Sequence, residues 1–189
     1  MLGRRHQKKC IEKLGTIQPP DKVEALLEKF GKTLKVYTIE ATEEQVEWWR
    51  RVTGGAGVMA KKDGKFVLVK GTLQSWGKSS AYWSFPGGAV KHGEDFEAAA
   101  VREFKEETGL DVEITDLLYL HGSIFRSSKG EQLVFYAALF EGKVVGGEMK
   151  TADPKEISEI KLFDELPEDR LVPWLRDELA RAASKTALV

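Results

Sequence analysis

Apolar and polar positions alternate in short runs through the middle of the chain, and this pattern predicts a sheet-rich domain. The predicted strands cover residues 54–60, 66–69, 82–85, 112–123 and 132–140. The pair Asp63-Gly64 predicts a hairpin between the first two strands, because it favours the backbone of a two-residue turn. Residues 71–81 and 142–153 are predicted loops, and the glycines of 86–88 predict a sharp turn.

A long helix is predicted after Asp95, and Gly109 is expected to end it. Phe104, Ala100 and Val101 share one arc of this helix at about 100° per residue, which predicts a face that packs on the sheet. The chain thus alternates strands with a helix, as α/β proteins do.

A second amphipathic helix is predicted at the C-terminal end, with Trp174, Leu175 and Leu179 facing inward. Together with the strands and the long helix, it predicts an α/β fold in which helices enclose a sheet, an α/β/α sandwich.

Residues 1–52 are predicted to form an extension of helix, strand and helix ahead of a main domain at 53–189. Its elements are expected from Asp21 to Gly31, over 34–39, and from Thr42 to Arg51. Its two adjacent tryptophans, Trp48 and Trp49, are predicted to pack or to form an interface rather than to stack on a base. The extension could cover a sheet edge or make a contact in a homodimer.

Three carboxylates gather on the long helix. Glu103, Glu106 and Glu107 are three and four residues apart, so they fall within a single arc. Like charges at this spacing destabilise a helix modestly, and carboxylate oxygens are preferred ligands of Mg²⁺ and Mn²⁺. Taken alone, the trio would more often be a solvated acidic face than a metal site.

The three glutamates belong to a longer sequence pattern. The pattern runs through Gly88, Glu94, Arg102-Glu103, Phe104, Glu106-Glu107, Gly109 and Leu110. This spacing resembles the Nudix box at every defined position, and the preceding Trp-Ser-Phe-Pro-Gly-Gly also resembles that family. We expect the resemblance to extend over residues 54–163. It implies a Nudix (MutT-like) hydrolase with the family's α/β/α sandwich and mixed sheet. Such an enzyme uses Mg²⁺ or Mn²⁺ to cleave a diphosphate bond in a nucleoside diphosphate linked to another moiety.

The resemblance also implies roles for individual residues. A backbone carbonyl at Gly88 can join the metal ligands Glu103, Glu106 and Glu107. Arg102 is expected to orient these glutamates and to pair with Glu94, and Glu103, Glu106 and Arg102 are the expected catalytic residues. The base that takes the proton from water is expected to be Glu106 or a glutamate of a later loop.

Four residues outside the box are weaker candidates. Glu156 and Glu159 fall in a zone that often supplies a further ligand or base in the family, although both could be plain surface residues. Trp76 could stack on a nucleobase or fold over its own loop, and Arg126 could reach a phosphate or lie in a solvated turn.

Composition restricts the partners. The 189 residues are 42% hydrophobic and 31% charged, with a net charge of −1, so bulk attraction to nucleic acid is not expected. The single cysteine, Cys10, excludes an intrachain disulfide. No apolar run approaches the roughly 18 residues of a membrane span, and the basic start at 1–9 lacks the apolar stretch of a secretory signal. A cytoplasmic protein acting on a small nucleotide derivative is therefore predicted.

The substrate stays open at this point. No proline lies between Leu110 and Pro154, where a common subclass of ADP-ribose hydrolases carries one, and this disfavours ADP-sugars. Nucleoside triphosphates, dinucleotides and nucleotide-sugars remain. Two further alternatives are a Nudix-fold binding module without catalysis and an RNA-directed decapping-type hydrolase. The complete set of box carboxylates disfavours the first, and the near-neutral charge disfavours the second.

Overall fold

The computed structural model describes residues 21–173, 175–177 and 179. Cys10, the basic start 1–9 and Trp174 lie outside the described residues, so the predictions made for them stay predictions. The side chains of Trp48 and Trp49 are not described either, and their packing role is likewise untested.

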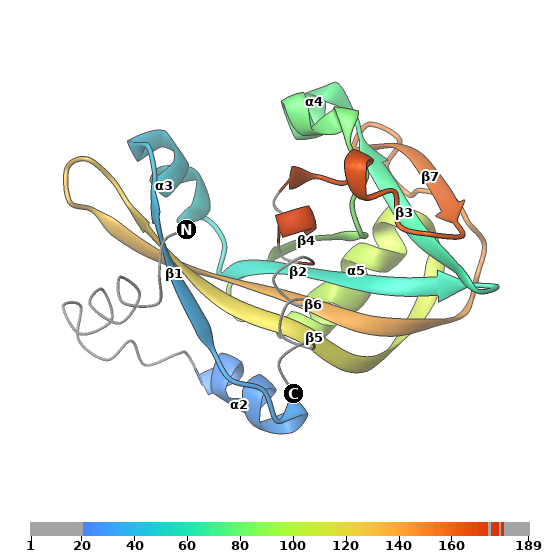
Figure 1. Cartoon of the computed structure of the whole chain (residues 1–189), viewed down its shortest axis with the longest axis horizontal. Coiled ribbons are helices and arrows are strands. Elements are labelled where there is room, and N and C mark those ends of the chain that lie inside the picture. The colour runs from blue at the N-terminus through green and yellow to red at the C-terminus, as the bar shows by residue number, and fades with distance from the viewer. Residues whose placement is uncertain (1–20, 174, 178, 180–189) are drawn as a thin grey trace.

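Strands dominate the chain (Figure 1). In chain order the elements are α2 (Asp21–Phe30), β1 (Lys35–Glu40), α3 (Glu43–Trp49), β2 (Gly54–Lys62), β3 (Lys65–Gly71), α4 (Leu73–Trp76), η1 (Gly77–Ala81), β4 (Gly87–Val90), α5 (Phe96–Thr108), β5 (Leu110–Arg126), β6 (Gln132–Gly147), β7 (Ile157–Phe163) and η2 (Glu168–Arg170). The helix–strand–helix order predicted for the extension is present in α2, β1 and α3.

The strands form one mixed seven-stranded sheet in the order β1-β5-β6-β2-β3-β7, with β4 added beside β2. β1 runs parallel to β5 and β2 parallel to β6, whereas the other pairs are antiparallel. The β2–β3 turn is the predicted one: Asp63 and Gly64 both have positive φ, 52° and 81°, as a two-residue hairpin turn requires.

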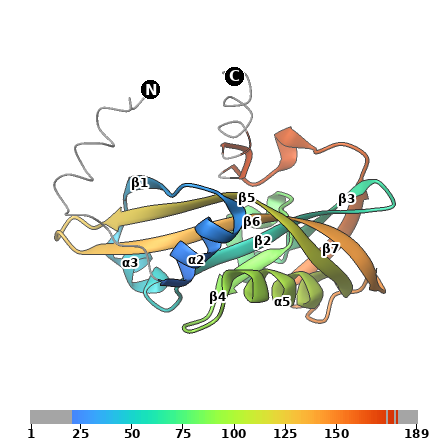
Figure 2. The ribbon, with the colours of Figure 1, turned by 90° about the horizontal axis from the view of Figure 1, so that it is seen from below.

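Alternate residues of the strands feed two cores on opposite faces of the sheet. On β2, Val58 joins a core with α2 and α5, while its neighbour Met59 packs against a second core. The second core contains Trp83, Phe85 and residues that follow η2. Figure 2 shows α2 and α5 on one side of the sheet and the orange-red segment after β7 on the other. The predicted α/β/α arrangement with a mixed sheet is confirmed.

Between β3 and α5 the secondary structure differs from the prediction. Residues 71–81 hold two short helices, α4 and η1, because the Thr72 side chain caps the first of them. Residues 82–85 form only isolated bridges, Ser84 with Val69 and Trp83 with Leu171. Within the turn expected at 86–88, Gly87 and Gly88 instead begin β4, and only Pro86 lies in a bend. A Cβ at Gly87 would lie 2.4 Å from Gly57 Cα, so glycine here permits close strand pairing rather than a bend.

The predicted loop at 142–153 is also wrong in its first part, since β6 continues to Gly147. A Cβ at Gly142 would lie 2.7 Å from both Val58 and Val112, so this glycine serves tight packing inside the sheet. The β5–β6 hairpin is therefore longer than the hydrophobic pattern indicates.

The extension is built into the same body. Val23 and Leu26 of α2 are buried in the core that contains Phe104 of α5, and β1 continues the sheet beyond β5. A domain boundary at residue 52 stays a prediction, as does a homodimer. Within the described ranges, every helix is too short or too polar to cross a membrane.

Candidate functional site

Helix α5 fixes the three box glutamates on one rigid element. Asp95 precedes the helix in extended conformation, and Gly109 ends it with φ 72°. Its buried stripe follows a spacing of three and four residues through Phe96, Ala99, Ala100 and Phe104. Val101 was predicted on this stripe but is 36% exposed, because it lies about 100° around the helix from Ala100.

The buried face of α5 includes a carboxylate in its last turn. Glu107 lies one turn beyond Phe104 and is only 4% exposed. Its Oε2 accepts a hydrogen bond of 2.8 Å from the Gly87 backbone N–H. Burial raises the pKa of Glu107 well above its usual range, and the neighbouring Glu103 and Glu156 charges add to this rise. A carboxylate in this position gains from a cation beside it.

Glu103 lies against the bare backbone of Gly88. A Cβ on Gly88 would lie 2.6 Å from the Glu103 carboxyl carbon, so only glycine leaves room for that carboxylate. The Glu103 side chain is 13% exposed, and burial raises its pKa despite the opposing Arg102. Gly88 and the Glu103 carboxylate therefore lie in contact, and the role of the Gly88 carbonyl as a metal ligand stays a prediction.

Arg102 forms hydrogen bonds with three glutamates of the box. Its Nε and Nη2 donate to the two carboxylate oxygens of Glu94 at 2.8 and 2.9 Å, the pairing that the sequence predicts. Its Nη1 reaches Glu103 at 2.6 Å and Glu106 at 3.2 Å. The Arg102 hydrogen bonds lower the pKa of Glu94 to about 2. Such a two-pronged contact fixes the guanidinium plane and the carboxylates that it touches.

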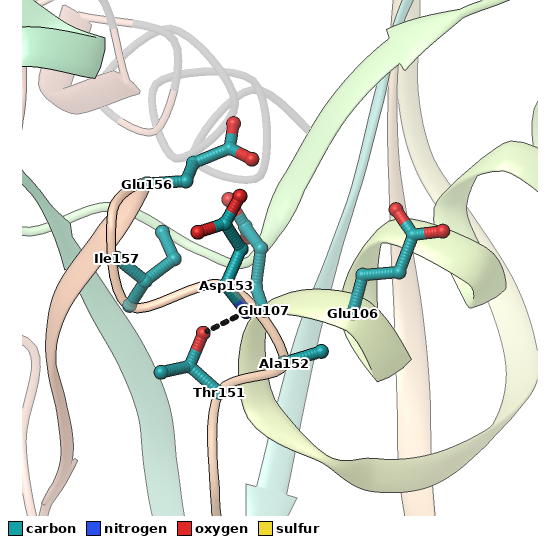
Figure 3. A pocket seen from close by; sticks show the side chains of 7 residues that line it. All are labelled: Glu106, Glu107, Thr151, Ala152, Asp153, Glu156 and Ile157. Carbon is teal, nitrogen blue, oxygen red and sulfur yellow. Dashed lines mark hydrogen bonds between the residues drawn. The ribbon is translucent and has the colours of Figure 1, made fainter.

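A cavity of about 270 Å³ opens beside the buried end of α5 (Figure 3). It is lined by Glu106, Glu107, Thr151, Ala152, Asp153, Glu156 and Ile157. Figure 3 shows the side chains of Asp153, Glu107 and Glu156 grouped together, with Glu106 apart from them on α5. The structure therefore brings two segments about 45 residues apart in sequence around one acidic cavity.

The structure separates the two later glutamates. Glu156 lines the cavity, whereas Glu159 lies within β7 opposite Lys70 and is absent from the lining. Asp153 is a lining residue that the sequence reasoning missed. Its Oδ1 accepts from the Lys155 N–H at 2.8 Å, a turn that Asp favours two residues before its donor, and this local signal could have drawn attention to it.

Trp76 and Arg126 do not line this cavity. A Cβ on Gly71 would lie 2.1 Å from the Trp76 ring, so the indole covers its own loop and packs against the second core. Arg126 ends β5, paired in register with Glu40 and Gln132, and its Nε is buried. The substrate contacts proposed for both stay predictions.

The donor set fits a hard divalent cation, although the side chains are turned to other partners. In the part of the chain that the structure describes, no three acidic, histidine or cysteine side chains stand ready as a ligand set. Glu103 and Glu106 point to Arg102, and Glu107 points to the Gly87 amide. The donors of the box are carboxylate and carbonyl oxygens, and the buried Glu107 carboxylate forms no ion pair with a cationic side chain, which suits Mg²⁺ or Mn²⁺.

Comparison with known proteins identifies the family. A family model described as the NUDIX domain matches residues 49–182, which is most of the chain. The chain belongs to the Nudix family. The resemblance found in the box is thereby confirmed, and the match leaves α2, β1 and most of α3 outside this Nudix domain.

Two relatives of this Nudix protein are named as a pyrophosphatase and a pyrophosphohydrolase. The ADP-ribose pyrophosphatase of Methanocaldococcus jannaschii is 35% identical over 107 residues, which cover 57% of this chain and 60% of that protein. The RNA pyrophosphohydrolase of Erythrobacter litoralis is 30% identical over 146 residues, covering 69% of this chain and 87% of that protein. Among solved structures, a MutT Nudix hydrolase from Burkholderia pseudomallei matches 68% of this chain and 95% of its own, with 28% identity and a TM-score of 0.54.

Proposed function

We propose that this Nudix domain is a pyrophosphohydrolase. It cleaves the diphosphate bond of a nucleoside diphosphate linked to another moiety and depends on Mg²⁺ or Mn²⁺. One observation carries the proposal: Glu107 is a buried carboxylate on the wall of a cavity and contacts the Gly87 N–H, while Glu103 lies against the neighbouring Gly88. Burying such a charge is costly unless a cation compensates it.

Gly88, Glu103, Glu106 and Glu107 would hold the metal. A divalent ion at this place neutralises phosphate charge, polarises the phosphoryl group and lowers the pKa of water. Arg102 holds the Glu103 and Glu106 carboxylates in orientation, and Glu94 holds Arg102 in turn. This second layer of contacts keeps the ligands on one side of α5.

Among the exposed carboxylates on the cavity wall, Glu106 and Glu156 are the candidates for accepting the proton of the attacking water. They approach from opposite walls, one on the helix and one on the loop before β7. Glu106→Gln and Glu156→Gln identify which of them acts, since the base variant alone regains rate as hydroxide concentration rises.

The substrate class is a small nucleotide derivative. The names of the two relatives share cleavage of a pyrophosphate bond at a nucleotide, one in ADP-ribose and one in RNA. The net charge of −1 favours a small molecule over a polyanion. The absence of a proline between Leu110 and Pro154 disfavours ADP-sugars, so triphosphates and dinucleotides belong in the test as well.

One panel tests the proposal. ADP-ribose, a dinucleoside polyphosphate, a nucleoside triphosphate, a UDP-sugar and 5′-triphosphate RNA are incubated with Mg²⁺, with Mn²⁺ or with a chelator, and products are resolved by chromatography. We expect metal-dependent release of a nucleoside phosphate from a small substrate, retained in Glu113→Gln, whose residue is exposed on β5. Turnover of RNA alone would contradict the substrate class. Tight nucleotide binding without turnover of any compound would contradict the enzyme itself and favour a binding module.

A further inference from the structure

The segment that carries Asp153 and Glu156 has one end fixed on the catalytic helix. The Lys150 N–H donates to Thr108 O at 2.8 Å, and the Ala152 N–H donates to Glu106 O at 2.9 Å. Carbonyls in the last turn of a helix lack partners within it, so the loop satisfies two of them. These two hydrogen bonds attach this end of the loop to α5.

The other end is fixed by two hydroxyls on a different element. Thr72 Oγ1 donates to Lys155 O at 2.6 Å, and Ser75 Oγ donates to Glu156 O at 2.7 Å. The Thr72 backbone N–H also donates to Glu156 O, at 2.8 Å. Three hydrogen bonds therefore converge on two consecutive carbonyls, one of them belonging to the cavity-lining glutamate.

The hydroxyls are themselves held in place. The Ser75 N–H donates to Thr72 Oγ1 at 3.2 Å and the Thr72 N–H donates to Ser75 Oγ at 3.1 Å, a reciprocal capping box around α4. Trp76, the last residue of α4, covers Gly71 at a distance that admits no side chain there. A four-residue helix has little stability alone, so this packing is what fixes the two hydroxyls.

Between its two anchors the loop has one compact turn. Asp153 O accepts from both the Glu156 and the Ile157 N–H groups, at 3.1 and 3.0 Å. Asp153 Oδ1 accepts from Lys155 N–H, so the same residue shapes the turn with its side chain. With both ends fixed, the position of the Glu156 side chain over the cavity follows from the position of α4.

We propose that Thr72 and Ser75 are positioning residues for Glu156. Their hydroxyls hold the loop so that the Glu156 carboxylate faces Glu107 across the cavity, and this assignment rests on the proposed hydrolase function. Without the hydroxyls the Lys155 carbonyl loses its partner and the Glu156 carbonyl keeps only the Thr72 backbone N–H, so the loop holds Glu156 less tightly. The reaction then loses rate, while the substrate affinity, set elsewhere, is kept.

The test uses a matched pair at one position. Thr72→Val keeps the shape and removes the hydroxyl, whereas Thr72→Ser keeps the hydroxyl. We expect Thr72→Val to lower kcat about 3- to 10-fold, the effect of one net hydrogen bond, with KM within about twofold of wild type. Thr72→Ser should retain kcat. Ser80→Ala is the control, because Ser80 Oγ donates only locally to Gly77 O at 2.7 Å.

A second background separates positioning from general damage. In Glu156→Gln, which itself lowers kcat, adding Thr72→Val should lower kcat no further. In the metal-free wild type and Thr72→Val, amide hydrogen exchange at Glu156 and Ile157 should be faster in the variant. Wild-type kcat in Thr72→Val or in Glu156→Gln, an equal loss in both backgrounds, or unchanged exchange would each overturn the proposal. A wild-type protein without any turnover overturns the hydrolase function instead, and the exchange measurement then decides the anchoring alone.

Discussion

Two acidic segments face each other across the cavity, and they are held by opposite means. Helix α5 is fixed by apolar packing, with Ala99, Ala100 and Phe104 fully buried, and it carries Glu107 into the interior. The loop at 150–157 is fixed by hydrogen bonds to carbonyls, and its Asp153 and Glu156 stay exposed. Burial of the Glu107 carboxylate therefore lowers the stability of the fold, whereas the exposed carboxylates of the loop lower it little. Residues of the loop can also be substituted without disturbing the core.

The largest effect is expected for Glu107→Gln. Turnover should fall about 10²- to 10⁴-fold, because a metal ligand is lost and metal binding contributes several kcal/mol to catalysis. The amide still accepts from Gly87, and the buried charge is gone, so the metal-free protein should unfold at a higher temperature than wild type. Kinetics and thermal denaturation in chelator measure both, with Glu113→Gln as the control. A variant that is active, or less stable without metal, contradicts the assignment.

The two glycines of β4 should separate function from folding. In Gly88→Ala the new methyl displaces the Glu103 carboxylate, a flexible group, so we expect turnover to fall about 10- to 100-fold with stability nearly kept. In Gly87→Ala the methyl meets backbone atoms of Ala56 and Gly57, so we expect a loss of about 1–3 kcal/mol or more in unfolding free energy. Denaturant titration and kinetics of both variants provide the check. Equal effects of the two changes would show that Gly88 has no special relation to Glu103.

On the loop side a smaller effect is expected. Asp153→Ala removes the acceptor of the Lys155 N–H and one charge from the cavity wall, so kcat should fall about 3- to 10-fold with unfolding unchanged. Asp153→Asn keeps the acceptor and should retain most of the rate. If Asp153→Asn loses as much as Asp153→Ala, the charge and not the turn is what matters.

The smallest effect is the pH dependence of the stability that the Glu94–Arg102 ion pair contributes. The pKa of Glu94 is lowered to about 2 by Arg102, so the pair stabilises the fold above the ordinary glutamate pKa near 4.5, and this stability is lost as pH falls toward 2. Wild type should therefore exceed Glu94→Gln by about 1–2 kcal/mol at pH 6 and converge with it near pH 2. Urea denaturation at several pH values measures the difference. A constant difference across that range would contradict the pairing.

The helix side of the site could be predicted from sequence because helical spacing converts positions into geometry. Glu103, Glu106 and Glu107 must share a face, and the Arg102–Glu94 pair follows from the box. The buried depth of Glu107 could not be predicted, since it depends on which sheet residues cover that end of α5. Val101 shows the limit of the same argument. The helical arc predicted to pack on the sheet was drawn one residue too wide, so it included Val101, whose side chain is exposed.

The loop side could not be predicted because its geometry is made by distant partners. Glu156 and Glu159 look alike in sequence, and only the pairing of β7 with β3 turns one toward the cavity and leaves the other along the strand. The glycines at 87, 88 and 142 read as turns, yet they lie in strands where neighbouring atoms come too close for a side chain. Close packing across a sheet leaves no local mark that distinguishes such a glycine from one in a turn.

The most direct test of the metal site is anomalous diffraction at the manganese edge from crystals grown with Mn²⁺. The predicted result is an anomalous peak among Gly88, Glu103, Glu106 and Glu107 in the wild type and its loss in Glu107→Gln. Crystals of an active wild-type protein that show Mn²⁺ only elsewhere, or a peak that persists unchanged in Glu107→Gln, would contradict the claim that these box residues hold the catalytic metal.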